Sequence, residues 1–176
     1  EVRHGRVDLI AGAFYTAPRL EYMDYFYPPF QAARSVVWMR SSKSFAYKEW
    51  KDLKGKDGLN VINNSFGDEF DRFAKTELTM HTVPTLEQAL RMLGAGRADY
   101  FIYEENPALA FASKLGVTGL KAAANPISNE NLYVTLSHKS ACNTGDVRGR
   151  IAKAMAKLGK DNTMRKLLDN GLRDWR

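Results

Sequence analysis

Residues 59–103 have the sequence LNVINNSFGDEFDRFAKTELTMHTVPTLEQALRMLGAGRADYFIY, and this stretch decides the fold class. Its two ends, Leu59–Asn63 and Asp99–Tyr103, are short apolar runs of the kind that form strands. Two segments with helical periodicity lie between them. Alternation of strands and helices predicts an α/β fold built from parallel βαβ units with right-handed crossovers. In such sheets ligands bind beyond the carboxyl ends of the strands.

Capping residues indicate where the two helices begin. Ser65 is expected to cap the first helix, with Asp68 in its first turn. Thr85 and Gln88 form a capping box at the start of the second helix, directly after Pro84. The apolar faces are expected at Phe66, Phe70 and Phe73 in the first helix and at Leu86, Leu90 and Leu93 in the second.

The same alternation continues on both sides of this stretch. Further strands are expected at Val7–Phe14, Val36–Arg40 and Leu132–Leu136, and further helices at Pro107–Leu115 and near the C-terminus around Ile151–Leu158 and Met164–Leu168. The chain has 176 residues, of which 44% are hydrophobic, so it can bury a globular core. No apolar run approaches the ~20 residues that a membrane-spanning helix needs.

Composition excludes several classes of function. The net charge is +6, but Lys and Arg are spread along the chain, so we expect no nucleic acid partner. A single cysteine, Cys142, allows neither an intrachain disulfide nor a thiolate metal cluster. His4, His81 and His138 lack ligand spacing, and no Gly-x-Ser-x-Gly elbow or phosphate-binding Gly-x-x-x-x-Gly-Lys loop occurs. We therefore expect no metal site and no cofactor and assign no catalytic residue, although a Ser/His/Asp pairing stays open on the sequence alone.

Three loops carry groups that suit a small charged ligand. Thr16 and Arg19 follow the first strand, and an arginine offers a planar fork of donors that matches a carboxylate, although it could equally pair with a surface glutamate. Ser65 lies at a helix N-terminus, where free N–H groups favour an anion. Glu104 falls at the carboxyl end of a buried strand, where it could meet a cationic ligand group or support the next helix.

The order of these motifs resembles the family-3 bacterial extracellular solute-binding proteins, the polar amino-acid receptors of ABC transporters. The resemblance extends over the whole chain, and its motifs are specific when taken together. The matching positions are Gly5, Asp8, Thr16, Arg19 and Tyr27-Pro28-Pro29-Phe30, then Asp52-Leu53-Lys54-Gly55-Lys56 and Val61, then Ala89, Leu90, Leu93, Gly96 and Asp99.

This resemblance implies a two-lobed, type II periplasmic-binding-protein-like fold whose lobes close on a ligand. Lobe two would cover residues 34–133, and lobe one would consist of residues 1–33 and 134–176. Lobe one would be incomplete, because the family has a strand, helix, strand and helix before the position of Glu1. We expect the strand edge left bare to promote self-association through residues 1–33.

The resemblance also implies roles for the loop residues. Arg19, near Thr16, would clamp the carboxylate of the ligand, and Ser65 and Phe66 would match a pair of hydroxyl residues that contact the same carboxylate. Glu104 would receive the ammonium group. Two departures from the family are the phenyl ring of Phe66 in place of a hydroxyl and the longer side chain of Glu104 in place of an aspartate.

The function implied is non-catalytic capture of a small zwitterionic or carboxylate ligand in the periplasm or outside the cell. The expected protein partner is the membrane permease of an ABC transporter. One alternative is a sensory module, in which closure signals to a membrane partner. Another is an enzyme similar to the dehydratases of cyclohexadienyl substrates, with Glu104 as general acid if burial raised its pKa.

Overall fold

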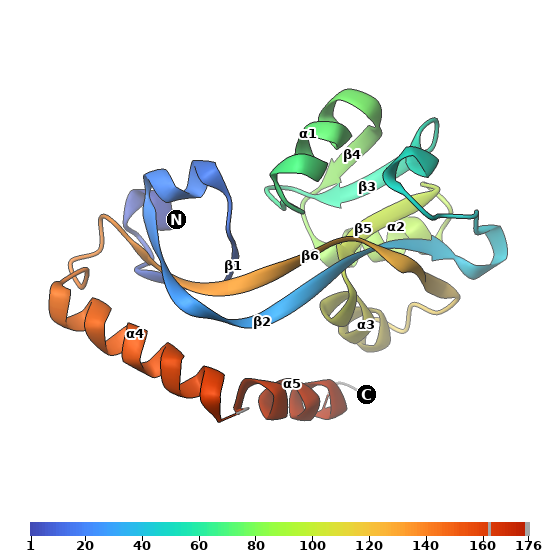
Figure 1. Ribbon diagram of the computed structural model, residues 1–176. Coiled ribbons are helices and arrows are strands. Elements are labelled where there is room, and N and C mark those ends of the chain that lie inside the picture. The colour runs from blue at the N-terminus through green and yellow to red at the C-terminus, as the bar shows by residue number, and fades with distance from the viewer. Residues whose placement is uncertain (162, 175–176) are drawn as a thin grey trace. The chain divides into compact units, whose positions relative to one another are not determined.

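A computed structural model describes residues 1–161 and 163–174 of the chain (Figure 1). Among these residues every helix is too short or too polar to cross a membrane. The chain divides into two compact units: a first unit of Glu1–Ala33 and Glu130–Gly171, and a second unit of Arg34–Asn129 with the described part of Leu172–Arg176.

Two strands are much longer than the sequence predicts. Strand β2 covers Met23–Arg40 and strand β6 covers Leu120–Ser137, 18 residues each, so both run through the two units. The predicted strands covered only the apolar ends, Val36–Arg40 and Leu132–Leu136. The remaining residues do not alternate between buried and exposed side chains. Backbone pairing therefore extends these strands without leaving a period-two pattern in the sequence.

The sheet of the second unit contains the predicted parallel βαβ units. In spatial order its strands are the second half of β2, β5 (Tyr100–Glu104), β3 (Asp57–Val61) and β4 (Thr79–Val83). Strand β3 pairs in parallel with both β4 and β5, and β5 pairs antiparallel with β2. The sequence does not predict β4, because only Val83 of its five side chains is buried. Such a sparse apolar pattern is typical of an edge strand.

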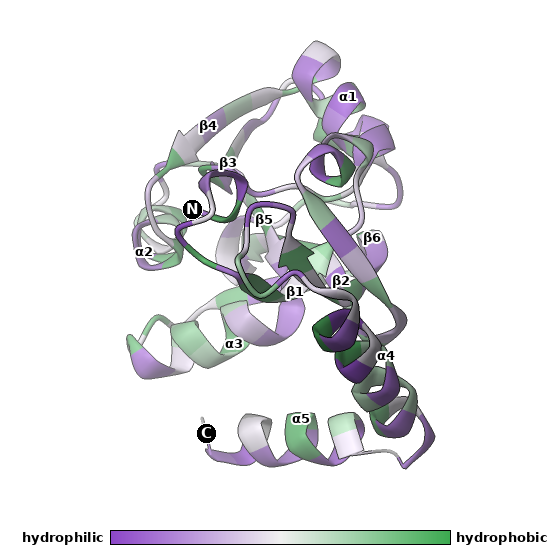
Figure 2. Ribbon diagram, turned by 90° about the vertical axis from the view of Figure 1, so that its left-hand side faces the viewer, coloured by the Kyte–Doolittle hydropathy of each residue, from purple (hydrophilic) through white to green (hydrophobic). Residues whose placement is uncertain are grey.

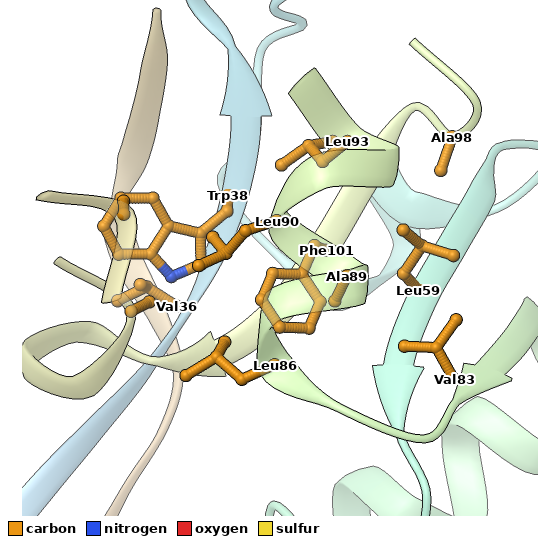
Figure 3. Packing of buried hydrophobic residues seen from close by; sticks show 12 residues of the cluster. Val36, Trp38, Leu59, Val83, Leu86, Ala89, Leu90, Leu93, Ala98 and Phe101 are labelled. Atoms are coloured by element: carbon orange, nitrogen blue, oxygen red, sulfur yellow. The ribbon is translucent and has the colours of Figure 1, made fainter. Parts of the chain in front are cut away.

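Helices cover both faces of this sheet. Helices α2 (Leu86–Gly94) and α3 (Glu105–Lys114) pack on one face, and α1 (Asp68–Glu77) packs on the other together with the short helix η4 (Trp50–Leu53). Figure 3 shows the layer beneath α2, where the side chains of Trp38, Leu90 and Phe101 point toward one another. All three side chains are buried. Burial of each such side chain contributes roughly 1.5–3 kcal/mol to the free energy of unfolding.

The start of α2 is as predicted, and the start of α1 is not. The Thr85 hydroxyl accepts a hydrogen bond from the Gln88 N–H at 3.2 Å, which confirms Thr85 as the cap of α2. The prediction that Ser65 caps α1 is wrong, since Gly67 holds the N-cap position. Gly67 has a φ of 103°, a backbone conformation that glycine adopts without steric cost. The Ser65 hydroxyl is left to bond another partner.

The first unit contains one end of the six-stranded sheet, with β1 (Leu9–Phe14) as its edge strand. The strand order is β1-β6-β2, and β1 pairs antiparallel with β6. The register of this pair shifts at Gly12, whose φ of 113° suits a bulge at a glycine. The short helix η1 (Val2–His4) begins the first unit. The short helix η3 (Ser41–Lys43) follows β2 and belongs to the second unit.

Helix α4 (Gly145–Lys160) closes the core of the first unit. Figure 2 shows hydrophobic and hydrophilic residues in alternation along α4, as expected for a helix with one buried face. The small cluster that it covers contains Phe26, Leu136, Met155, Ile151 and Leu158. Helix α5 (Thr163–Asp174) follows, so the two predicted C-terminal helices are confirmed.

A substitution within the α2 layer tests this description of the core. Leu90 is fully buried in the layer, so Leu90→Ala should lower the free energy of unfolding by about 2–5 kcal/mol, through lost apolar contact and a residual cavity. The matched control is Leu109→Ala on α3, where the side chain is 51% exposed and the loss should stay within about 0.5 kcal/mol. Urea denaturation followed by circular dichroism measures both. Equal losses would contradict the packing in Figure 3.

Candidate functional site

The first unit places Thr16 and Arg19 directly after β1. Thr16 is buried, and its carbonyl accepts a hydrogen bond from the Arg19 N–H at 3.1 Å in the short helix η2 (Ala17–Glu21). The guanidinium Nη1 donates to the Phe14 carbonyl at 3.1 Å, which ties the Arg19 side chain to the end of β1. Within the described residues no carboxylate lies at salt-bridge distance from Arg19. The guanidinium therefore retains donors for an external carboxylate.

Tyrosines that the sequence analysis did not assign to the site surround this point. The Tyr25 hydroxyl donates to the same Phe14 carbonyl at 2.8 Å, and its ring lies 5.0 Å from Tyr15 and 5.6 Å from Tyr133. Burial raises the Tyr25 pKa while the Arg19 charge opposes that shift, so Tyr25 is a neutral donor at neutral pH. These rings come from three separate segments of the chain. Of the three, only Tyr25 lies in the aromatic-rich stretch after position 24, so the sequence could have indicated Tyr25 alone.

The second unit places Ser65 and Phe66 in the loop between β3 and α1, where Asp71 contacts both. The Ser65 hydroxyl donates to Asp71 Oδ2 at 2.5 Å, and the Phe66 N–H donates to Asp71 Oδ1 at 3.0 Å. The Phe66 ring is 2% exposed and packs against Phe70 with the ring centroids 6.0 Å apart. Phe66 therefore offers a ligand only its backbone. The ligand role of Ser65 and Phe66 stays a prediction. The two donors concerned, the Ser65 hydroxyl and the Phe66 N–H, already donate to Asp71.

Glu104 ends β5 as a partly buried carboxyl. It precedes α3 but makes no side-chain capping hydrogen bond to that helix. Burial raises the pKa of the Glu104 carboxyl, while hydrogen bonding from its own backbone and the nearby Asn64 amide favour the charged form. A desolvated carboxyl that does not cap a helix suits a cationic ligand group, which would restore its charge. The role of Glu104 toward an ammonium group stays a prediction.

Unsatisfied polar groups gather near Glu104. Ser35 lies directly opposite Glu104 in the antiparallel pair of β2 and β5, so the two side chains project from the same face of the sheet. Asn60 belongs to β3, and Asn64 follows it. Ser35 Oγ, Asn60 Oδ1 and Asn64 Nδ2 are buried and have no hydrogen-bond partner of ordinary geometry in the described part of the chain. Buried groups of this kind cost free energy until a ligand or water binds them.

Other reactive groups do not assemble around these loops. Among the residues that the structure describes, no three His, Cys, Asp or Glu side chains are grouped so that they could hold a metal ion. Cys142 is exposed and free. The candidate site therefore consists of hydrogen-bonding and charged groups.

Comparisons with known proteins identify the fold. No family model and no curated protein matches the sequence. Among solved structures, the GluR0 ligand-binding core in complex with L-glutamate matches with a TM-score of 0.81 and 15% identity, over 97% of this chain and 75% of that chain. The amino acid ABC transporter substrate-binding protein AbpA from Streptococcus pneumoniae, bound to L-arginine, matches with a TM-score of 0.80 and 19% identity, over 99% of this chain and 71% of that chain. The fold is that of the periplasmic binding proteins.

A third structure of this fold is a histidine kinase sensor domain with similarity to periplasmic binding proteins. It matches with a TM-score of 0.78 and 20% identity, over 97% of this chain and 72% of that chain. The predicted class, α/β and periplasmic-binding-protein-like, is thereby confirmed. Sequence identities this low establish the fold alone.

The raised pKa of Glu104 predicts a pH-dependent effect of Glu104→Gln on stability. In the folded state this carboxyl holds its proton to a higher pH than in the unfolded chain. Folding therefore loses free energy as the pH rises through that window. Glutamine has no proton to lose, so the thermal midpoint of the variant should exceed that of the wild type at pH 7.

The difference should shrink toward about pH 4, where the glutamate is largely protonated in both states. Thermal melts at both pH values measure it. Glu69→Gln on α1, where the carboxylate is exposed, is the control and should show no comparable trend. A variant less stable than the wild type at pH 7 would show that the charged carboxyl is stabilised by the fold.

Proposed function

We propose that this chain is an extracytoplasmic solute-binding protein of family 3 that captures a small amino-acid-like ligand for an ABC transporter. The observation that carries the proposal is Arg19, a guanidinium tied to the end of β1 with no carboxylate partner in the described residues. Two proteins of the same fold support the ligand class, since one was solved with L-glutamate and the other with L-arginine. The transport role and the permease partner rest on AbpA and on the sequence motifs.

Each unit carries one charged group suited to an amino-acid-like ligand: Arg19 in the first and Glu104 in the second. Arg19 binds the carboxylate, because a guanidinium donates two parallel N–H bonds to a planar anion. Glu104 binds the ammonium group, because a cation beside a buried carboxyl offsets the cost of its desolvation. The Tyr25 hydroxyl supports Arg19 through the carbonyl that they share.

A sensory role is the first alternative, and the match with a histidine kinase sensor domain favours it. The same ligand chemistry would then change the activity of a membrane partner. A permease encoded beside this protein supports transport, whereas a kinase domain encoded in the same chain supports sensing.

An enzyme of the cyclohexadienyl-dehydratase type is the second alternative, and the raised pKa of Glu104 favours it. A carboxyl whose pKa burial raises is a better general acid than an exposed one. Incubation with a cyclohexadienyl substrate distinguishes the two functions, because dehydration produces an aromatic ring with strong ultraviolet absorbance. We expect no such product.

Replacing Arg19 tests the carboxylate clamp. Arg19→Ala should weaken the tightest-binding member of an amino-acid panel by about tenfold or more, the loss expected for a charge-assisted hydrogen bond. Arg19→Lys should recover only part of this affinity, because an ammonium lacks the planar fork. Isothermal titration calorimetry measures both, with Arg150→Ala as the control, since Arg150 is an exposed arginine of the same unit. Unchanged affinity in Arg19→Ala would remove Arg19 from the site.

Replacing Glu104 tests recognition of the ammonium group. Glu104→Gln should weaken L-glutamate or L-arginine by about tenfold or more, and should weaken the corresponding deaminated acids far less. The physical reason is that only the amine-bearing ligands lose an opposite charge. Calorimetry on each matched pair gives the comparison. An equal loss for both members of a pair would assign Glu104 a structural role.

A further inference from the structure

Asp71, in the first turn of α1, accepts hydrogen bonds from the loop that precedes this helix. Its two carboxylate oxygens accept the Ser65 hydroxyl at 2.5 Å and the Phe66 N–H at 3.0 Å. The neighbouring donors also have acceptors within the chain: the Ser65 N–H donates to Asn64 Oδ1 at 3.1 Å, and the Gly67 N–H approaches Ser65 Oγ at 3.5 Å. The donors that precede this helix are therefore satisfied without a ligand.

The charge of Asp71 makes this arrangement selective. A carboxylate near a helix N-terminus is favoured by the helix dipole and by hydrogen bonds from the loop. A second carboxylate at the same donors would have to displace the first or accept repulsion at short range. An anionic group of a ligand is thus disfavoured at Ser65 and Phe66.

The adjoining groups favour the opposite charge. Asn64 connects the loop to Glu104, since its Oδ1 accepts the Ser65 N–H and its amide lies beside the Glu104 carboxyl. Ser35, whose side chain projects from the sheet face that Glu104 shares, is 0% exposed, and its Oγ has no partner in the described residues. A carboxyl flanked by an unpartnered hydroxyl oxygen is a site for an N–H-bearing cation, which donates to both.

We propose that Asp71 is a specificity-determining residue: its carboxylate fills the anion position before α1, so the second unit accepts the cationic group of a ligand at Glu104 and rejects a carboxylate at Ser65 and Phe66. The group that the second unit accepts is then an amine or a guanidine. This inference rests on the proposed function for the identity of the ligand, but the occupancy of the anion position can be tested without it.

Acetate is the first probe, because it is a bare carboxylate. The Phe66 amide resonance should not respond to acetate in the wild type and should shift saturably in Asp71→Ala, which frees the Phe66 N–H and the Ser65 hydroxyl. Asp71→Asn, which removes the charge but keeps one acceptor oxygen, is the second variant in case the alanine variant does not fold, and it should show a weaker saturable response. Glu69→Ala, an exposed carboxylate of the same helix, is the control and should behave as the wild type. A saturable response in the wild type, or none in either folded Asp71 variant, overturns the proposal.

L-arginine and agmatine are the second pair of probes, because agmatine is arginine without its carboxylate. In Asp71→Ala the ratio of the agmatine to the arginine dissociation constant should rise about tenfold over the wild-type ratio, since only arginine gains the freed donors. An unchanged or lower ratio in a variant that binds both probes overturns the proposal. Failure of the wild type to bind any amino acid or amine would instead overturn the proposed function, and the acetate titration would still decide the role of Asp71.

Discussion

Strand β5 is buried on both faces, and the organisation of the second unit depends on that constraint. Tyr100, Phe101 and Ile102 are each 0% exposed, with Phe101 beneath α2 and α3 and its two neighbours on the α1 side. Such a strand needs hydrogen-bonding partners on both edges and a helix layer on each face. The parallel partner β3 and the antiparallel partner β2 supply the edges. Because the apolar run ends at Glu104, the carboxyl of this residue lies directly at the end of the buried strand β5.

The cost of that placement is visible in the groups around Glu104. Its carboxyl is desolvated, and Ser35 Oγ and Asn64 Nδ2 lack partners of ordinary geometry in the part of the chain that is described. Folded domains satisfy nearly all buried polar groups, so a buried group without a partner in the described residues takes a water molecule or a ligand group.

The two units treat anions in opposite ways. In the first unit, Arg19 is positioned by the Phe14 carbonyl and keeps donors available. In the second unit, the donors before α1 are satisfied by Asp71. Hydrogen-bond donors at a helix terminus require an acceptor whether or not a ligand is present. The Asp71 carboxylate therefore stabilises the start of α1. By the same contacts it disfavours a ligand anion in the second unit.

The sequence by itself determined the elements whose side chains repeat with a clear period, together with the α/β class. Thr85 was recognisable as a cap, and Arg19 and Glu104 as charged groups at strand ends, because each depends on neighbours close in sequence. Tertiary structure decided the remainder. Edge strand β4 buries too few side chains to leave a pattern, and the tyrosines around Arg19 come from segments far apart in the chain. Ser65 was expected to cap α1, but Gly67 holds the N-cap position with a positive φ, and the Ser65 hydroxyl donates to Asp71 instead.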